Sequence, residues 1–282
     1  MNKNWVIKSS GDENVISSLS RDLGIERPLA QLLVQRGITT FKEAKDFFRP
    51  DLANLHDPFL MKDMDVAVER ILDAIQAGEK VLIYGDYDVD GTTAVALVYS
   101  FFKEHFKDID YYIPDRYDEG YGVSQKGIDY ASEHGVSLII ALDCGIKAVE
   151  KIDYAREKGI EFIICDHHNP GDRIPDAVAV LDPKQEECTY PYKDLSGCGV
   201  GFKLIQAYGI QTGQTPESIF DFLDLVVVSI ASDIVPITGE NRIMAHYGLK
   251  KLNERPSMGL KAIKAVAGID KQVIDVEDIV FK

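Results

Sequence analysis

The chain reads Val81-Leu82-Ile83-Tyr84-Gly85-Asp86-Tyr87-Asp88-Val89-Asp90-Gly91 at the point that decides its fold. The first four residues are apolar without alternation, as is typical of a strand buried on both faces. Three aspartates follow at alternate positions, and the glycine and threonines after them suit the beginning of a helix. Strand, polar loop and helix in this order begin a parallel α/β unit.

Further apolar runs continue this arrangement along the chain, at residues 109–113, 138–142, 162–165 and 178–181. Helical segments of about a dozen residues separate the first four runs. Runs that are apolar on both faces and joined by helices indicate a parallel sheet covered by helices on both sides. The sequence therefore predicts an α/β fold with about five core strands in a parallel sheet flanked by helices.

Helical patterns lie on both sides of this region. Those before the sheet cover residues 14–23, the stretch after Pro28, 40–48 and 65–77, and those after it cover residues 200–208, 216–232, 241–252 and 258–267. Thr40 precedes Glu43 as in a capping box, and Pro50 and Pro58 indicate a linker. We expect a helical N-terminal lead-in over residues 1–60, an α/β domain over residues 61–282, and a helical C-terminal part within it.

Composition excludes several classes of protein. Hydrophobic residues make up 45% and charged residues 27% of the 282, which is ordinary for a globular chain and argues against extended disorder. The formal charge of -15 counts against an extended nucleic-acid surface, so any nucleic acid must be held locally, by metal ions or by parts beyond these residues. No secretory signal or long apolar run occurs, which indicates the cytoplasm. Four cysteines without metal-site spacing indicate core residues.

Acidic residues follow the ends of the expected strands: Asp86, Asp88, Asp90, Asp115, Asp143, Asp166 and Asp182. In an open parallel sheet the carboxyl ends of the strands meet at one edge, so these side chains should converge. Clustered carboxylates repel one another unless cations neutralise them, which predicts a site for divalent metals. The adjacent His167 and His168 favour manganese or a similar transition metal over calcium.

A structural interpretation competes with this one at each position. A single aspartate after a strand is more often a helix N-cap, and Asp115 and Asp182 fit that role because prolines flank them. Asp90 could likewise begin a helix. The aspartates of residues 86–90 and the sequence Asp166-His167-His168 exceed what capping needs. The isolated histidines are assigned to structure: His56, His105, His134 and His246.

The acidic stretch at residues 86–91, Asp143-Cys144-Gly145, Asp166-His167-His168 and Ser232-Asp233 resemble the four successive motifs of the DHH phosphoesterase superfamily. Residues 120–124 and 196–204 are similar to its RecJ branch, whose members degrade single-stranded DNA from the 5′ end. The resemblance covers residues 60 to 282. It implies a two-metal phosphodiesterase acting as a 5′-to-3′ single-strand exodeoxyribonuclease in DNA repair and recombination.

The resemblance also implies roles for individual residues. The expected metal ligands are Asp86, Asp88, Asp90, Asp143, Asp166, His167 and Asp233, where Asp86 and Asp166 are ligands or supports for ligands. Asp143 is a candidate bridge between two divalent ions, with manganese favoured and magnesium as the alternative. Asp143, His167 and His168 are the expected catalytic residues. His168 would contact the scissile phosphate. Among Arg116, Lys126, Lys203 and Arg242, sequence position favours Arg116 as the phosphate-binding cation, because it follows a strand beside the glycine-rich residues 120–122; the alternative is a solvated loop arginine.

Two departures from the family pattern matter. Tyr84 stands where some DHH enzymes carry a histidine ligand, which predicts either weaker binding of the first metal or a larger role for Asp86. RecJ proteins continue into a DHH-associated C-terminal domain and an oligonucleotide-binding barrel, and the sequence is expected to end before them. Single-stranded DNA is the expected partner, with a single-strand-binding protein or helicase as further partners and a monomer as the expected state.

Two other functions remain open at this point. The first is a DHH-family hydrolase of small phosphate compounds such as nano-oligonucleotides, phosphoadenosine phosphate or cyclic dinucleotides. The acidic charge suits this function, but such relatives usually carry a histidine in their first motif. The second is an inactive DHH scaffold, against which the intact acidic and histidine motifs argue.

Overall fold

The computed structural model of the protein describes residues 4–281, which form two compact units divided between Asn54 and Leu55. The first unit contains α1 (Glu13–Leu23), α2 (Arg27–Val34) and α3 (Phe41–Phe48). Asp12 caps α1, and the expected capping box between Thr40 and Glu43 begins α3. The helices enclose a small core of buried side chains: Ile16, Leu19, Ala30, Leu33 and Ala44.

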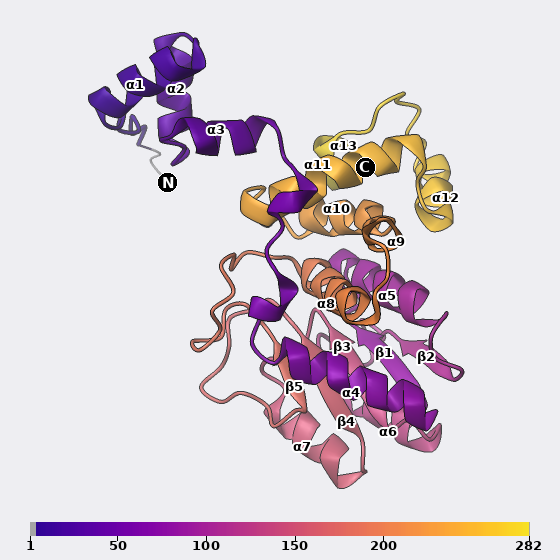
Figure 1. The fold of residues 1–282 in the computed structure, drawn as a ribbon. Coiled ribbons are helices and arrows are strands. Elements are labelled where there is room, and N and C mark those ends of the chain that lie inside the picture. Colours follow the sequence, from indigo (N-terminus) through magenta and orange to yellow (C-terminus); the bar gives the residue numbers. More distant parts are fainter. Residues whose placement is uncertain (1–3, 282) are drawn as a thin grey trace. The chain divides into compact units, whose positions relative to one another are not determined.

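The second unit is built around a parallel sheet of five strands in the order β2-β1-β3-β4-β5 (Figure 1). The strands are β1 (Val81–Gly85), β2 (Ile109–Tyr112), β3 (Leu138–Leu142), β4 (Glu161–Cys165) and β5 (Ala179–Leu181). Every residue of β1 and β3 is buried, as expected for runs without alternation. The predicted α/β class and its five strands are confirmed.

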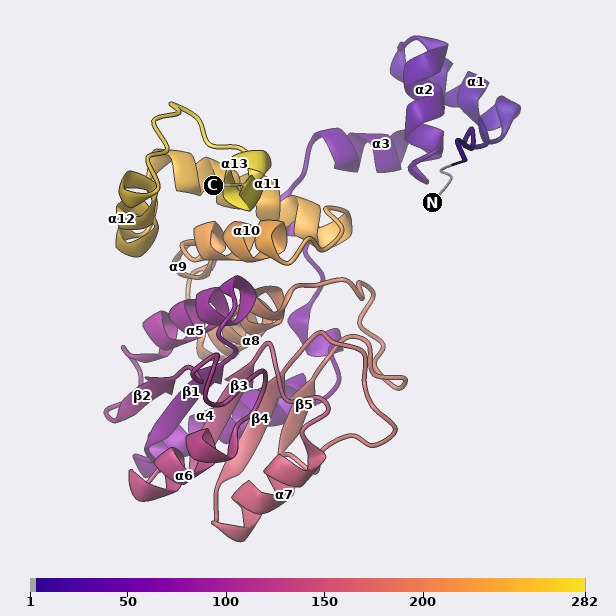
Figure 2. The same cartoon turned by 180° about the vertical axis from the view of Figure 1, so that it is seen from behind.

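Helices cover both faces of this sheet (Figures 1 and 2). One face carries α4 (Met64–Ala77), α5 (Val89–Phe102) and α8 (Gly197–Thr212), and the other carries α6 (Gln125–Glu133) and α7 (Val149–Glu157). Buried residues of α6 and α7, such as Ile128 and Ile152, share a core with Leu82 and Ile139 of the sheet. Burial of these apolar faces fixes the layers.

The chain after α8 is helical, with α9 (Pro216–Phe220), α10 (Leu223–Ser232), α11 (Gly239–Glu254), α12 (Met258–Val266) and α13 (Val276–Phe281). The expected single helix over residues 216–232 is wrong, because Phe222 leaves the helical conformation and the chain turns there. The turn lets α9 pack on α8 while α10 packs on α5 and α11. The sequence did not indicate α13.

The connections leave the sheet in opposite directions at its centre. After β1 the chain enters α5 on one face, and after β3 it enters α7 on the other face. Since β1 and β3 are neighbours, their carboxyl ends form a topological switch point, the place at which open α/β sheets bind ligands. Among the described residues, no helix has both the length and the apolar character needed to cross a membrane.

Candidate metal centre

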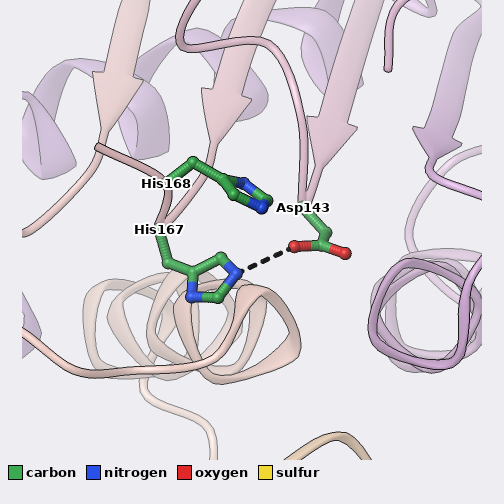
Figure 3. Close-up of side chains that lie close together, drawn as sticks. All are labelled: Asp143, His167 and His168. Atoms are coloured by element: carbon green, nitrogen blue, oxygen red, sulfur yellow. Dashed lines mark ion pairs between the residues drawn. The ribbon is translucent and has the colours of Figure 1, made fainter. Parts of the chain in front are cut away.

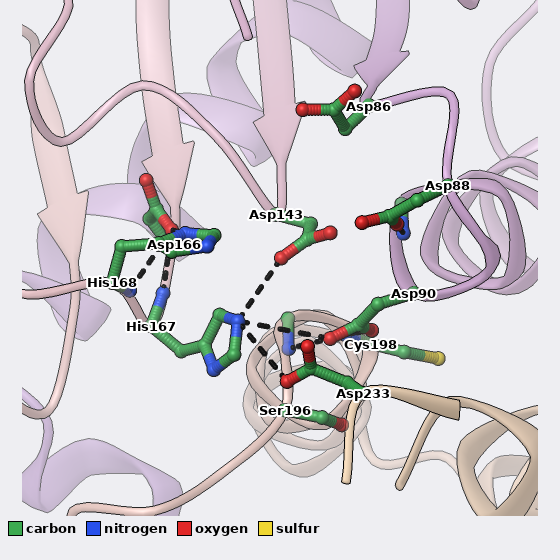
Figure 4. A network of polar contacts seen from close by, with 12 residues as sticks. Asp86, Asp88, Asp90, Asp143, Asp166, His167, His168, Ser196, Cys198 and Asp233 are labelled. Carbon is green, nitrogen blue, oxygen red and sulfur yellow. Dashed lines mark hydrogen bonds and ion pairs between the residues drawn. The ribbon is translucent and has the colours of Figure 1, made fainter. Parts of the chain in front are cut away.

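The acidic residues of three segments meet His167 at the carboxyl ends of the central strands (Figure 4). Asp90 lies in the first turn of α5, Asp143 directly follows β3, and Asp233 follows α10. His167 lies beyond β4. The carboxyl ends of β1 and β3 therefore bring together side chains that are far apart in the sequence, as the strand pattern predicted.

The imidazole of His167 is the centre of this cluster. Its Nε2 atom lies 3.2 Å from Oδ1 of Asp143, 3.6 Å from Oδ2 of Asp233 and 3.8 Å from Oδ2 of Asp90. Figure 3 shows the ring directed at Asp143, with His168 beside it. Two sets of donor atoms are close enough to hold a metal ion, one from Asp90, His167 and Asp233 and the other from Asp143, His167 and His168.

The chemistry of this donor set fits a cation. Nδ1 of His167 lies 2.9 Å from the carbonyl oxygen of Leu195, which can only accept, so Nδ1 donates to it while Nε2 faces the carboxylates. Both Nε2 of His167 and Oδ1 of Asp143 are buried and make no hydrogen bond within the described residues. A positive ion between two facing donor atoms that have no hydrogen-bond partner would stabilise both.

Asp90 is held from behind by α8 and α10. Its Oδ2 accepts the amide of Gly197 at 2.7 Å, and its Oδ1 accepts the amide of Cys198 and lies within reach of the Ser229 hydroxyl, both also at 2.7 Å. The positive end of the α8 dipole faces the same carboxylate. Burial nevertheless raises the pKa of Asp90 above its usual value, which indicates that these donors alone do not offset the loss of water.

Asp143 is forced into its position by the backbone. Its φ angle of 59° lies in the left-handed region, and its amide donates to the carbonyl of Cys165 at 2.8 Å. A Cβ atom on Gly197 would lie 2.5 Å from Oδ1 of Asp143, so only glycine lets α8 approach this side chain. Burial and the neighbouring charges of Asp90 and Asp88 raise the pKa of Asp143. A bound cation would lower this pKa again, because it favours the ionised carboxylate.

Asp166 contacts His168 instead of joining either donor set. One of its oxygens lies 2.7 Å from Nδ1 of His168, and the other accepts the amide of Ile146 at 2.9 Å. Burial acts to raise the pKa of Asp166, but the hydrogen bonds from His168 and Ile146 outweigh it and the pKa is lowered. The same contact with Asp166 raises the pKa of His168, whose Nε2 lies 3.0 Å from the hydroxyl of Tyr121. Asp166 thus orients His168 and favours its protonated form.

Asp86 and Asp88 border the cluster on the β1 side (Figure 4). Asp88 is the N-cap of α5 through its bond with the amide of Gly91 at 2.9 Å, so the helix begins earlier than the alternative in which Asp90 begins it. Asp86 accepts the amide of Gly122 at 3.0 Å, and burial raises its pKa to about 6. Both carboxylates hold local structure, and the charge of Asp88 also helps to raise the pKa of Asp143.

Tyr84 supports the loop that carries Tyr121. Its hydroxyl donates to the carbonyl of Gly122 at 2.9 Å and accepts the amide of Ser124 at 3.0 Å, while its ring stacks on Tyr112. The residue in the position of the family histidine is therefore a fully buried support for this loop.

Several other predicted residues lie apart from the cluster. Asp115 and Asp182 accept amides of their own turns, which is the structural role considered for them. Lys203 is fully buried and pairs with Glu240 at 2.6 Å, so it is not exposed to a phosphate. Arg116 is exposed, and its guanidinium lies 5.4 Å from the centre of the Tyr87 ring.

Sequence reasoning missed the polar residues that support the cluster: Tyr121, Ser196 and Ser229. Ser196 was detectable as the N-cap before the glycine-rich start of α8. Ser229 precedes Asp233 by four positions, so the two share one face of a helix. Tyr121 lies in the stretch 120–124 that resembles the RecJ branch, but its contact with His168 was not predicted, because it joins residues 47 positions apart.

A family model and the relatives found by sequence comparison agree on one family. A model described as "DHH family, N-terminal domain" matches residues 80–230. The single-stranded-DNA-specific exonuclease RecJ of Bacillus subtilis (strain 168) is 40% identical over 278 residues, which cover 99% of this chain and 34% of that protein. The protein of the same name from Escherichia coli (strain K12) is 33% identical over 277 residues, covering 92% of this chain and 47% of that one.

Solved structures agree with this similarity. A crystal structure of exonuclease RecJ bound to manganese is 28% identical, with a TM-score of 0.71 over 82% of this chain and 57% of that one. RecJ from Thermus thermophilus in complex with Mn²⁺ has a TM-score of 0.78 at 24% identity, over 95% of this chain and 37% of that one, and supports the fold. The chain thus spans between 34% and 47% of the length of the two curated relatives described above.

Proposed function

The chain belongs to the DHH family, and from this premise we propose that it is the catalytic core of a metal-dependent 5′-to-3′ single-strand DNA exonuclease of the RecJ type. The observation that carries the proposal is Nε2 of His167, which is buried without a hydrogen-bond partner among the described residues and faces three carboxylates between 3.2 and 3.8 Å away. Such a set of oxygen and imidazole donors suits Mn²⁺, with Mg²⁺ as the alternative.

The chain's own residues would hold two divalent ions. Asp90, Asp143, His167 and Asp233 supply one set of ligands, and Asp88 with Asp143 supplies part of the second, with Asp86 beside it. When bound, two such ions lower the pKa of water and stabilise charge on the attacking and leaving oxygens of a phosphodiester. Asp143 lies between the two groups of carboxylates, which supports its assignment as the bridging ligand (Figure 4).

His168 and Arg116 are assigned to the substrate phosphate. Asp166 orients the His168 ring and raises its pKa, so its Nε2 can donate a hydrogen bond to a phosphate oxygen in place of Tyr121. Arg116 is exposed beside Tyr87 and can contribute a second positive charge. A protonated imidazole and a guanidinium would offset the negative charge of the carboxylates near the scissile group.

The wider partners follow from the family and from the charge distribution. Residues 55–282 contain 23 basic and 39 acidic residues, which does not suit an extended DNA-binding surface. Metal ions and a few basic side chains would therefore hold the DNA locally. Most of the length of the relatives lies outside this chain, and we assign to that remainder much of the grip on DNA. We assign the protein to the cytoplasm, where DNA repair and recombination place it beside single-strand-binding proteins or helicases, and we expect a monomer.

The test uses 5′-phosphorylated single-stranded DNA with and without Mn²⁺. A chain that spans the length of these relatives should shorten the strand from its 5′ end, and Asp143→Ala or His167→Ala should reduce the rate by at least about a thousandfold without unfolding the protein. The circular dichroism spectrum and the thermal unfolding midpoint check that the variants fold. Residues 1–282 alone should cleave with low processivity.

The same assay separates the exonuclease from a hydrolase of small phosphate compounds. The net charge of -15 favours this second function, because a small ligand needs no extended basic groove. Rapid Mn²⁺-dependent hydrolysis of a dinucleotide, without cleavage of any single strand, would replace the exonuclease proposal with the second function. If residues 1–282 alone were as processive as a chain that spans the relatives' length, the remainder of that length would not supply the grip on DNA.

A further inference from the structure

Ser229 contacts both Asp90, a candidate metal ligand, and Ser196, the N-cap of α8. Its side chain is fully buried on α10, four residues before Asp233. Its Oγ lies 2.7 Å from Oδ1 of Asp90 and 2.6 Å from Oγ of Ser196, the N-cap of α8. The backbone of α10 therefore carries one candidate ligand and, one turn earlier, a hydroxyl that contacts another.

The direction of the hydrogen bond between Ser229 and Asp90 follows from the hydrogens that the two side chains carry. A hydroxyl has one hydrogen, and an ionised carboxylate can only accept, so the Ser229 hydroxyl donates to Asp90. Oγ of Ser196 lies 2.6 Å from the same hydroxyl and accepts the amide of Gly199 at 3.1 Å. Ser229 thus links the carboxylate of Asp90 to the N-cap of α8.

The arrangement leaves one particular oxygen of Asp90 for a cation. Oδ1 accepts two hydrogen bonds, from Cys198 and Ser229, and is saturated by them. Oδ2 accepts only the amide of Gly197 and is the oxygen that lies 3.8 Å from Nε2 of His167. Rotation of the carboxylate would break all three contacts at once. Asp90 is thereby held so that Oδ2 faces the donor set.

We propose that Ser229 is a positioning residue, which fixes the carboxylate of Asp90 in the orientation that presents Oδ2 to a divalent ion. The inference deepens the proposed function and rests on it, since it concerns the same metal centre. Outer hydrogen bonds of this kind typically change metal affinity by about 10- to 100-fold. Ser196 acts one step further away, so its removal should have a smaller effect.

The test measures Mn²⁺ affinity directly, by isothermal titration calorimetry of the metal-free protein with manganese chloride at a fixed neutral pH. Ser229→Ala should weaken Mn²⁺ binding by about 10- to 100-fold, and Ser196→Ala by less than that. Ser229→Cys keeps a similar volume but has a weaker donor, so its affinity should fall between those of the wild type and Ser229→Ala. The cysteine variant decides the question if the alanine variant does not fold.

Ser137 offers a matched control, because its hydroxyl also donates to a carboxylate, that of Glu79, beside the amino-terminal end of β3. Ser137→Ala should bind Mn²⁺ as the wild type does. In the nuclease assay, Ser229→Ala should need more Mn²⁺ for half-maximal rate while the KM for DNA at saturating Mn²⁺ stays unchanged. A merely structural effect would not separate these two quantities.

The Mn²⁺ affinities of these variants distinguish a failure of the role of Ser229 from a failure of the metal centre. Wild-type Mn²⁺ affinity in Ser229→Ala and Ser229→Cys, together with lost binding in Asp90→Asn, would overturn the role of Ser229 and leave the metal centre intact. Unchanged affinity in Asp90→Asn and Asp143→Ala would overturn the metal centre itself, and the role of Ser229 with it.

Discussion

At the scale of single residues, two candidate ligands are associated with an unfavourable backbone. Asp143 has a φ angle of 59°, and Ile234, the neighbour of Asp233, has a φ angle of 58°. The left-handed region is rare for residues other than glycine, and a β-branched side chain is especially disfavoured there. Ile234 is 78% exposed, so burial of its side chain does not offset this cost. Strain of this kind is typical of functional sites.

Replacing Ile234 with glycine should therefore stabilise the protein. Relief of the left-handed strain is worth about 1 to 3 kcal/mol, and the extra freedom of glycine in the unfolded chain offsets about 0.4 to 1 kcal/mol of it. We expect Ile234→Gly to raise the free energy of unfolding by about 1 kcal/mol and the thermal midpoint by roughly 2 to 4 °C. Urea unfolding followed by circular dichroism measures the change.

Ile210 is the control for this substitution. It is also exposed, at 56%, but lies inside α8, where glycine is an unfavourable residue. Ile210→Gly should lower the free energy of unfolding by about 0.5 to 1 kcal/mol, which is the opposite sign. A loss of stability in both variants would show that the left-handed angle of Ile234 carries no strain.

At the scale of elements, α8 has the most demanding position, because its first turn contacts two carboxylates. Its amides bind Asp90, and Gly197 has no side chain where a Cβ atom would lie 2.5 Å from Oδ1 of Asp143. Gly197→Ala should therefore displace α8 or Asp143. We expect a loss of about 1 to 3 kcal/mol in stability and a fall in Mn²⁺ affinity of at least about tenfold.

Gly259 provides a comparison within another first helical turn. It is the second residue of α12, and an added Cβ would meet nothing within 4 Å. Gly259→Ala should raise stability by up to about 1 kcal/mol, because alanine is the better helix former, and should leave Mn²⁺ affinity unchanged. Equal effects of the two substitutions on affinity would contradict the contact between Gly197 and Asp143.

The strands and the cluster could be predicted from the sequence because both depend on local patterns. Buried parallel strands read as continuous apolar runs, and the rule for carboxyl ends then brought Asp90, Asp143 and His167 together. The break at Phe222 was missed, because an apolar stretch with helical periodicity looks alike in one helix or two. The contacts of Ser229 could not be predicted, since they depend on how α10 packs against α5 and α8.

At the scale of the whole molecule, negative charge is unevenly distributed. Residues 1–54 contain 8 basic and 7 acidic residues, while residues 55–282 have a large acidic excess. Part of this excess is buried at the carboxyl edge of the sheet, where Asp86, Asp90, Asp143 and Asp182 are almost fully inaccessible. Without cations, the folded state must hold these carboxyl groups close together, so stability and metal content should be linked.

The metal-free protein should therefore become less stable as pH rises. Burial raises the pKa of Asp86 to about 6 and that of Asp182 to about 7, both well above their values in an unfolded chain. A raised pKa means that the folded state binds protons which the unfolded state releases near about pH 4. This stabilisation is complete below about pH 4 and is lost as pH passes the folded-state values, so unfolding free energy should fall between about pH 5 and pH 8.

Urea unfolding in the presence of EDTA at several pH values tests this linkage. Added Mn²⁺ should stabilise the protein most at the alkaline end, where the ligands are ionised and protons no longer compete with the metal. Asp182→Asn should reduce the fall in stability between about pH 6 and pH 8, because it removes one buried ionisable group that lies outside both donor sets. Stability that rises across this interval without metal would contradict the raised pKa values, and with them the electrostatic argument for a cation at this edge of the sheet.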